Sequence, residues 1–182
     1  DPKIAAIYHC DLHFKMCIEY AQMMSTAHRM LDGFETKKLS STGKRFLKYY
    51  QHPNPKKENK LYKAVHHFHP CTQWVRENDQ NYNWLFSCWK KLCEEHVYRR
   101  GKEHGSWIAL QDVLCHLPNN IPIFNSLTDF PLAMKQYPQC MDFSDPVKSY
   151  RNFYHHKPFS MKWTNRSTPE WFSHEKHQKQ MV

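Results

Sequence analysis

The chain has 182 residues with a formal net charge of +9, and 15% of its residues are aromatic. This length is enough for one well-buried core, and the excess of positive charge points to a polyanionic partner, most simply DNA. No run of 18 or more apolar residues is present, so we expect neither a transmembrane helix nor a membrane partner. The alternative is a basic soluble protein whose aromatic residues serve only its core.

Helical periodicity predicts a first helix from Pro2 or Lys3 to Leu31, ended by Asp32-Gly33. In one continuous helix, residues three or four apart share a face, which would place four polar residues on a single stripe: Asp11, Lys15, Glu19 and Gln22. The surrounding residues are mostly apolar, so we expect the stripe to be partly shielded from water. Shielded carboxylates and amines have shifted pKa values, and such groups carry out proton transfer and covalent catalysis.

Residues 34–60 are basic and polar, with turn residues but no clear periodicity. They predict a mobile surface loop whose cations, Lys44 and Arg45 among them, lie along a phosphate backbone. The alternative is a disordered insertion without a role.

The segment His66-His67-Phe68-His69-Pro70-Cys71 concentrates metal-binding side chains, and His9 and His13 are spaced as an i, i+4 pair. The paired-cysteine spacing of zinc sites is absent, however, and fourteen histidines make chance clustering easy. We therefore expect no metal and no other cofactor. Instead, we expect His69-Pro70 to start the next helix and His69 to border the active cleft.

The longest helix is predicted from about Thr72 to Arg100, with Gly101 as its stop. Its end gathers cations that are suited to phosphate binding: Arg99, Arg100, Lys102 and His104. The alternative is an ordinary surface ion pair between Glu95 and Arg99, worth about 0.5 kcal/mol.

A helix over Ser106–His116 should follow, and then an irregular proline-rich segment with one short helix near residues 132–136. Ser144-Asp145-Pro146 places proline directly after an N-cap and predicts a helix to about His156, a signal that Thr168-Pro169-Glu170 repeats. No segment alternates convincingly between polar and apolar residues, so the expected fold is all-α, a single compact helical domain over residues 1–182. Four residues on the predicted helices complete the expected DNA-binding set: Gln22, Arg76, Asn81 and Arg151.

The seven cysteines lack CxxC spacing, and several fall at apolar positions of predicted helices. This pattern indicates reduced thiols and a cytoplasmic protein. Familiar catalytic motifs are also absent: the chain has no GxxxxGK[ST], GxGxxG, GxSxG or HExxH. Nucleotide-driven motors, dinucleotide oxidoreductases, serine hydrolases and the common zinc proteases are therefore not leading hypotheses.

Several motifs nevertheless occur together: Asp1-Pro2, Asp11-x-His13-x-Lys15-Met16-x-x-Glu19-x-Ala21-Gln22, His69-Pro70, Trp74, Asn81-x-x-Trp84 and Glu95-x-x-x-Arg99-x-Gly101-Lys102. With these motifs the chain resembles the pyrimidine-dimer DNA glycosylase-like proteins of phages. More distantly it resembles the phage pyrimidine-dimer glycosylase/AP lyases, which are small all-α DNA repair enzymes. The resemblance spans roughly residues 1–107, with a further match over residues 144–172.

The resemblance implies glycosylase and lyase chemistry on a damaged or modified pyrimidine nucleotide in DNA, in the cytoplasm of the host cell. Enzymes of this kind attack the sugar C1′ with the N-terminal α-amine, while a glutamate of the first helix stabilises the developing positive charge. Glu19 is the closest match to that glutamate. Asp1 is not the small residue expected at the nucleophile position, which leaves Lys15, or a group upstream of Asp1, as the source of the amine.

Two alternatives stay open. The first is a phage enzyme that hypermodifies DNA bases by group transfer to a pyrimidine, with Asp11, His13, Glu19 and His69 as acid/base and binding groups. The second is a DNA-binding protein without catalysis, whose polar stripe is a buried network. Both enzymatic hypotheses require the opening helix to meet the His69-Pro70 start of the long helix, forming an acidic pocket inside a cationic rim.

Overall fold

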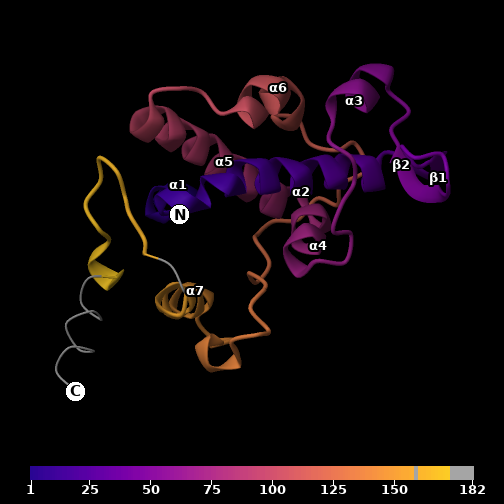
Figure 1. Cartoon of the computed structure of the whole chain (residues 1–182). Helices are drawn as coiled ribbons and strands as arrows, with labels where there is room; N and C mark the ends of the chain where they lie inside the picture. The colour runs from indigo at the N-terminus through magenta and orange to yellow at the C-terminus, as the bar shows by residue number, and fades with distance from the viewer. Residues whose placement is uncertain (158–159, 173–182) are drawn as a thin grey trace.

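The structure is a computed structural model that describes residues 1–157 and 160–172 (Figure 1). Its elements, in chain order, are α1 (Pro2–Tyr8), the 3-10 helix η1 (Asp11–Lys15), α2 (Met16–Leu31), β1 (Phe34–Leu39), β2 (Phe46–Gln51), α3 (Pro55–Lys60), α4 (Pro70–Glu77), α5 (Asp79–Arg100), α6 (Gly105–Leu114), the 3-10 helix η2 (Pro138–Cys140) and α7 (Pro146–His155). The chain is mostly helical but contains a two-stranded antiparallel sheet, so the all-α expectation is wrong. Among the described helices, none is long and apolar enough to cross a bilayer.

The sheet occupies the segment that was expected to be a mobile loop. β1 and β2 pair along their whole length, and α3 follows them. Aromatic and β-branched residues on both sides of a glycine-containing turn favour such a hairpin. Gly33 lets the hairpin start close to α2, because a Cβ at this position would lie only 2.3 Å from the carbonyl oxygen of Arg29 and 2.6 Å from that of Gln51.

The helix expected from Pro2 to Leu31 is broken into α1, η1 and α2, because the backbone becomes extended at His9 and Cys10. Cys10 is completely buried. The guanidinium of Arg99 donates to the carbonyls of Ile7 and His9 at 2.7 and 2.8 Å, contacts that satisfy the carbonyls left open where α1 ends. The single polar stripe of the expected helix is therefore split where η1 passes into α2.

The helix expected from Thr72 to Arg100 is also broken, at Asn78, whose extended backbone separates α4 from α5. The side-chain oxygen of Asn78 accepts a hydrogen bond from the amide of Asn81 at 2.9 Å and so caps α5. The predicted stop is confirmed, because Gly101 ends α5 in the left-handed region at φ 72°.

The later elements follow the predictions more closely. The bounds of α6 differ from the expected Ser106–His116 by one residue at the start and by two at the end. Asp145 caps α7 as predicted. No helix forms at residues 132–136, where Met134 is buried in irregular chain, and the next helical turn is η2. A helical segment does begin at Glu170, and its continuation beyond residue 172 lies outside the described part of the chain.

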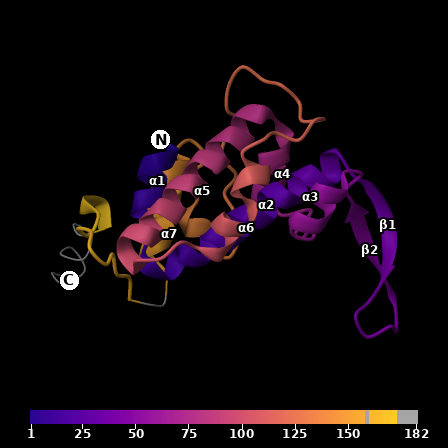
Figure 2. The same cartoon turned by 90° about the horizontal axis from the view of Figure 1, so that it is seen from above.

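The core forms around α2, which packs against α4, α5 and α6, while α1 lies along α5 (Figures 1 and 2). Met24 and Leu92 are fully buried, and each such side chain contributes roughly 1.5–3 kcal/mol relative to exposure. Trp89 is also fully buried, and its indole nitrogen donates to the carbonyl of Cys17 at 2.8 Å. This bond and the surrounding packing fix the first turns of α2 against α5.

A single buried arginine attaches the hairpin and α3 to α2. The guanidinium of Arg29 donates to the carboxylate of Glu58 and to four carbonyl oxygens, those of Tyr50, Glu58, Leu61 and Tyr62. All of its nitrogens are therefore satisfied although the residue is only 1% exposed. Glu58 also accepts from the Tyr49 hydroxyl at 2.6 Å, and these hydrogen bonds, despite opposing burial, lower the pKa of Glu58 to about 2.

Replacing Arg29 by leucine should lower the free energy of unfolding by about 3–5 kcal/mol, because the Glu58 carboxylate and four carbonyls would lose their donor. Urea denaturation at pH 7 measures this loss. Arg45→Leu is the matched control, since Arg45 is exposed at the hairpin turn, and it should change stability by less than about 0.5 kcal/mol. Similar losses in the two variants would contradict the anchoring role of Arg29.

Candidate functional site

The candidate site lies where η1 passes into α2. Lys15 ends η1, Glu19 lies in the first turn of α2, and the Lys15 ammonium is 3.8 Å from the Glu19 carboxylate. The Glu19 side chain is 42% exposed, so the expected shielding of this carboxylate is not found. The pair is open to solvent and accessible to a large substrate.

Two histidines lie behind this ion pair. His9 donates from Nδ1 to the carbonyl of Ala5 at 2.8 Å, which leaves Nε2 to accept from the Tyr20 hydroxyl at 2.9 Å. His13 Nδ1 lies 2.7 Å from the Tyr154 hydroxyl of α7. Burial, with smaller effects from neighbouring cations, lowers the pKa of each histidine to about 4. Both rings are therefore neutral near pH 7.

His69 brings the start of α4 to the same place. α2 packs against α4, and His69 caps α4 by accepting a hydrogen bond from the amide of Cys71 at 3.2 Å. Burial and the neighbouring His66 lower the pKa of His69, and Glu19 opposes this shift. Glu19 is thus within electrostatic reach of His69, as the expected meeting of the two helices requires.

Lys157 is a site residue that the sequence did not single out. It follows α7, and its pKa is lowered by burial and by the Lys15 ammonium, while Cys10 and Glu19 oppose the shift. Its ammonium lies 3.9 Å from the ring centre of Phe153. The only sequence signal was its position at the end of a basic, aromatic helix. We refer to Lys15, Glu19, His13, His69 and Lys157 as the Glu19 cluster.

Asp11 does not belong to the Glu19 cluster. Its carboxylate accepts from the backbone and side chain of Thr164 and from Arg99, and these bonds lower its pKa although burial alone would raise it. Arg99 has a fully buried side chain and also donates to Glu95, which in turn binds Arg166. Asp11 and Arg99 therefore hold α1, η1, α5 and the C-terminal segment together instead of facing a substrate.

The expected DNA-binding residues fall into three groups. Asn81, like Arg99, is buried; its amide binds Trp74 and Thr128, so neither residue is carried into the proposal below. Gln22 and His104 are partly buried, and His104 caps α6. The exposed members lie on the hairpin, at the end of α5 and on α7: Lys44, Arg45, Arg100, Lys102 and Arg151.

Arg76 borders an open depression of about 540 Å³ on α4, which also includes Pro70, Gln73, Glu77 and Asp129. Burial lowers the pKa of Arg76. The depression begins one residue after His69 but includes no member of the Glu19 cluster. Where an acidic pocket inside a cationic rim was expected, the Glu19 carboxylate is partly exposed and pairs with Lys15.

Within the described residues, one group of three metal-ligating side chains converges, and it lies at the base of the hairpin: His28, Asp32 and His52. His28 Nε2 donates to the carbonyl of His116, so Nδ1 presents its lone pair, 3.9 Å from Asp32. His52 Nδ1 accepts from the amide of Asn54, so the proton is on Nε2, 3.8 Å from Asp32. A metal needs a lone pair from every ligand, so these proton positions do not fit a metal ion.

Buried neutral histidines make stability depend on pH. Burial, with smaller effects from neighbouring charges, lowers the pKa of His28 to about 3 and those of His9 and His13 to about 4, whereas an unfolded histidine titrates near 6.5. The unfolded state therefore binds more protons below pH 6.5, and the free energy of unfolding must fall as pH drops from 6.5 toward 4.

Urea denaturation between pH 7 and 5 should show this loss, at up to about 1.4 kcal/mol per pH unit for each such histidine. Carboxylates with lowered pKa values contribute only at more acid pH. His9→Gln should reduce the slope by about one proton, because it removes a histidine whose pKa is lowered to about 4. A flat profile between pH 6.5 and 5 would rule out buried neutral histidines.

The Glu19 cluster thus combines an exposed carboxylate, two imidazoles and two amines, one of lowered pKa, from three stretches of the chain that are distant in sequence. Such a set is suited to proton transfer and to stabilisation of a developing positive charge. No protein-family model matches the chain, and no similar protein was found among curated proteins or solved structures.

Proposed function

We propose that the chain is a DNA-acting enzyme that removes a damaged or modified pyrimidine base, in the manner of a glycosylase/AP lyase, at the Glu19 cluster. The observation that supports this most directly is the exposed Glu19 carboxylate, which lies 3.8 Å from the Lys15 ammonium. Lys157 interacts electrostatically with Lys15 and Glu19, and both lysines act on neutral His13. A carboxylate that is exposed at the surface can reach a nucleotide turned out of a duplex.

The proposed chemistry needs an amine and a carboxylate of the protein that both reach the same sugar of the DNA. Attack of the neutral amine on C1′ expels the base, which leaves with the electron pair of the glycosidic bond and takes up a proton. Loss of a proton from the amine and cleavage of the C1′–O4′ bond, with a proton taken up by O4′, then give an iminium whose positive charge Glu19 stabilises. Lys157 is the better amine, because burial and Lys15 lower its pKa and so raise its unprotonated fraction. Lys15 forms the ion pair with Glu19 and is better suited to hold the carboxylate or a phosphate.

The charge of the chain supports DNA as its substrate, and its free thiols support a cytoplasmic location. A net charge of +9 and the exposed cations of the hairpin, the end of α5 and α7 suit a polyanion. All seven cysteines are free thiols, and only Cys115 is exposed. Free buried thiols fit a reducing compartment, so we propose that the protein acts on DNA in the cytoplasm.

The acid/base members of the cluster support a second candidate, group transfer to a DNA base without base loss. His13 is neutral and its Nδ1 lies 2.7 Å from the Tyr154 hydroxyl, which holds the ring in place. An imidazole positioned in this way can bind a base and assist transfer without any covalent amine intermediate. Mass analysis of nucleosides after incubation with ordinary and modified phage-type DNA separates base loss, base alteration and simple binding.

Glu19→Gln should lower the turnover by at least about a hundredfold, the scale of a lost electrostatic or acid/base catalyst, while DNA affinity stays within about threefold. Glu94→Gln is the matched control, because Glu94 is also half-exposed and paired with a lysine of its own helix at 3.4 Å. Unchanged product formation by Glu19→Gln would remove the carboxylate from the mechanism.

Borohydride reduction during the reaction traps an amine–sugar intermediate as a stable adduct. We expect trapping by the unchanged protein and by Lys15→Met, and its loss in Lys157→Met. Peptide mapping of the adduct identifies the amine directly. Base alteration without any adduct would favour group transfer, and neither product nor adduct would reduce the function to DNA binding.

A further inference from the structure

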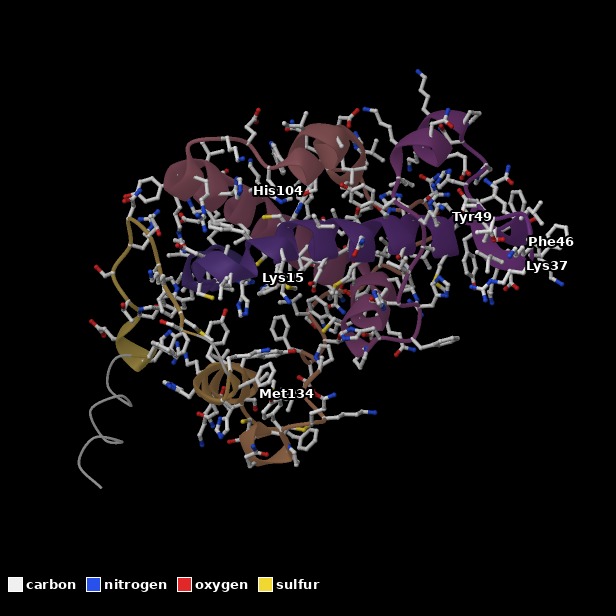
Figure 3. All side chains as sticks on the ribbon, viewed as in Figure 1. Lys15, Lys37, Phe46, Tyr49, His104 and Met134 are labelled. Atoms are coloured by element: carbon white, nitrogen blue, oxygen red, sulfur yellow. The ribbon has the colours of Figure 1, made fainter. Side chains whose placement is uncertain are left out.

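The β1–β2 hairpin projects beyond the helices as a two-stranded ribbon (Figure 2). Six residues per strand span about 20 Å. Lys37 and Phe46 lie at this end of the molecule, away from Lys15 of the Glu19 cluster (Figure 3). The ribbon contacts the helices at its base and through Lys38 and Tyr49, which bind Glu58 of α3, so its opposite face is open to a partner.

The cations of the ribbon are concentrated and partly unpaired. Residues 34–51 carry five cations and one carboxylate, a net charge of +4 out of +9 for the chain. Lys38 binds Glu58, and Lys48 binds Glu35, but Lys37, Lys44 and Arg45 have no acidic partner among the described residues. Three cations are therefore available for an anion.

The register places one unfavourable pair on the ribbon. Lys37 lies directly opposite Lys48, and side chains of directly opposed residues share a face. Two like charges at this spacing destabilise a sheet, and Glu35 relieves only Lys48. Polyanion binding on this face would relieve the repulsion that remains at Lys37.

The same face leads toward the candidate site. Tyr50 shares it with Lys37, and the Tyr50 ring lies 5.0 Å from that of His67. His67 is followed by Phe68, which is 81% exposed, and by His69 of the Glu19 cluster. Basic and aromatic side chains thus continue from the ribbon to the start of α4, where His69 of the Glu19 cluster lies, an arrangement that suits nucleic acid.

We propose that the hairpin is a groove-binding arm for double-stranded DNA, which holds the duplex through Lys37, Lys44 and Arg45 while the Glu19 cluster faces the reacting nucleotide. A two-stranded ribbon fits the major groove, which is about 12 Å wide. Phe46, 67% exposed near the turn, adds an apolar contact beside the cations. This inference rests on the proposed function for the identity of the nucleic acid, but it concerns a separate surface.

The test uses fluorescence anisotropy of a labelled 20-base-pair duplex at several salt concentrations. The triple variant Lys37→Ala/Lys44→Ala/Arg45→Ala should bind at least tenfold more weakly, and its log–log salt slope should be smaller by about 2.7, which is about 0.9 per lost phosphate contact. The control triple variant Lys3→Ala/Lys90→Ala/Lys135→Ala removes three exposed cations from other parts of the fold and should keep both values near those of the unchanged protein.

Lysine acetylation of the unchanged protein gives a readout without any variant. Duplex DNA should protect Lys37 and Lys44, while Lys3, Lys90 and Lys135 stay reactive. Equal affinity of the two triple variants, or no protection at Lys37 and Lys44, overturns the arm. Self-association through the exposed Leu39 and Phe46, seen as a second copy in sedimentation, would overturn it as well.

The two proposals fail in different ways. If the hairpin variant binds DNA normally and Glu19→Gln alone removes the product, the proposed DNA-binding role of the hairpin is wrong, while the proposed enzymatic activity is supported. If the hairpin variant loses DNA binding while no DNA substrate gives a product with the unchanged protein, the DNA-binding role of the hairpin is supported and the proposed chemistry is wrong.

Discussion

The attachment of the hairpin depends on one ion, the buried guanidinium of Arg29. Its five hydrogen bonds reach β2, α3 and the chain that follows α3, so three segments share one donor. A buried charge is tolerated only when it is fully paired. The pairing requires Glu58 and the carbonyls to meet at one point, and this requirement sets the angle at which the ribbon leaves the helices.

Arg99 plays the corresponding role at the other end of the molecule. It binds two carbonyls at the end of α1 together with Asp11 and Glu95, and Asp11 and Glu95 reach the C-terminal segment through Thr164 and Arg166. This network fixes where η1 starts and therefore where His13, Lys15 and Glu19 lie. At both ends of the molecule, a buried arginine thus positions the segments that carry the exposed functional groups. Arg99 was expected to bind DNA, but its charge is used inside the fold.

Part of the architecture could be predicted because its signals are local. Gly101, Asp145-Pro146 and Asp32-Gly33 mark helix ends through backbone and capping preferences that need no tertiary contact. The break at Asn78 carried such a signal too, since asparagine is a favoured N-cap, as did the hairpin, with aromatic residues on both sides of Gly43. The strength of the helical pattern outweighed these local signals in the predictions.

The remainder could not be predicted, because it depends on contacts between distant residues. The break at His9 depends on Arg99, ninety residues away. Lys15 and Glu19 were found together because they are one helical turn apart, whereas Lys157 joins them only through the fold. The packing of the opening helix against the helix that follows His69 was predicted, but the exposure of Glu19 was not, because spacing alone does not reveal which face of a helix is covered.

The distribution of thiols has a chemical consequence. Burial raises the pKa of Cys88 to about 12, and contact with Cys17 together with burial raises that of Cys93. Oxidants and alkylating reagents attack the thiolate, so these core sulfurs are passive at neutral pH. Cys115, exposed after α6, is left as the site of first reaction, and a maleimide dye placed there would report on the molecule without entering its interior.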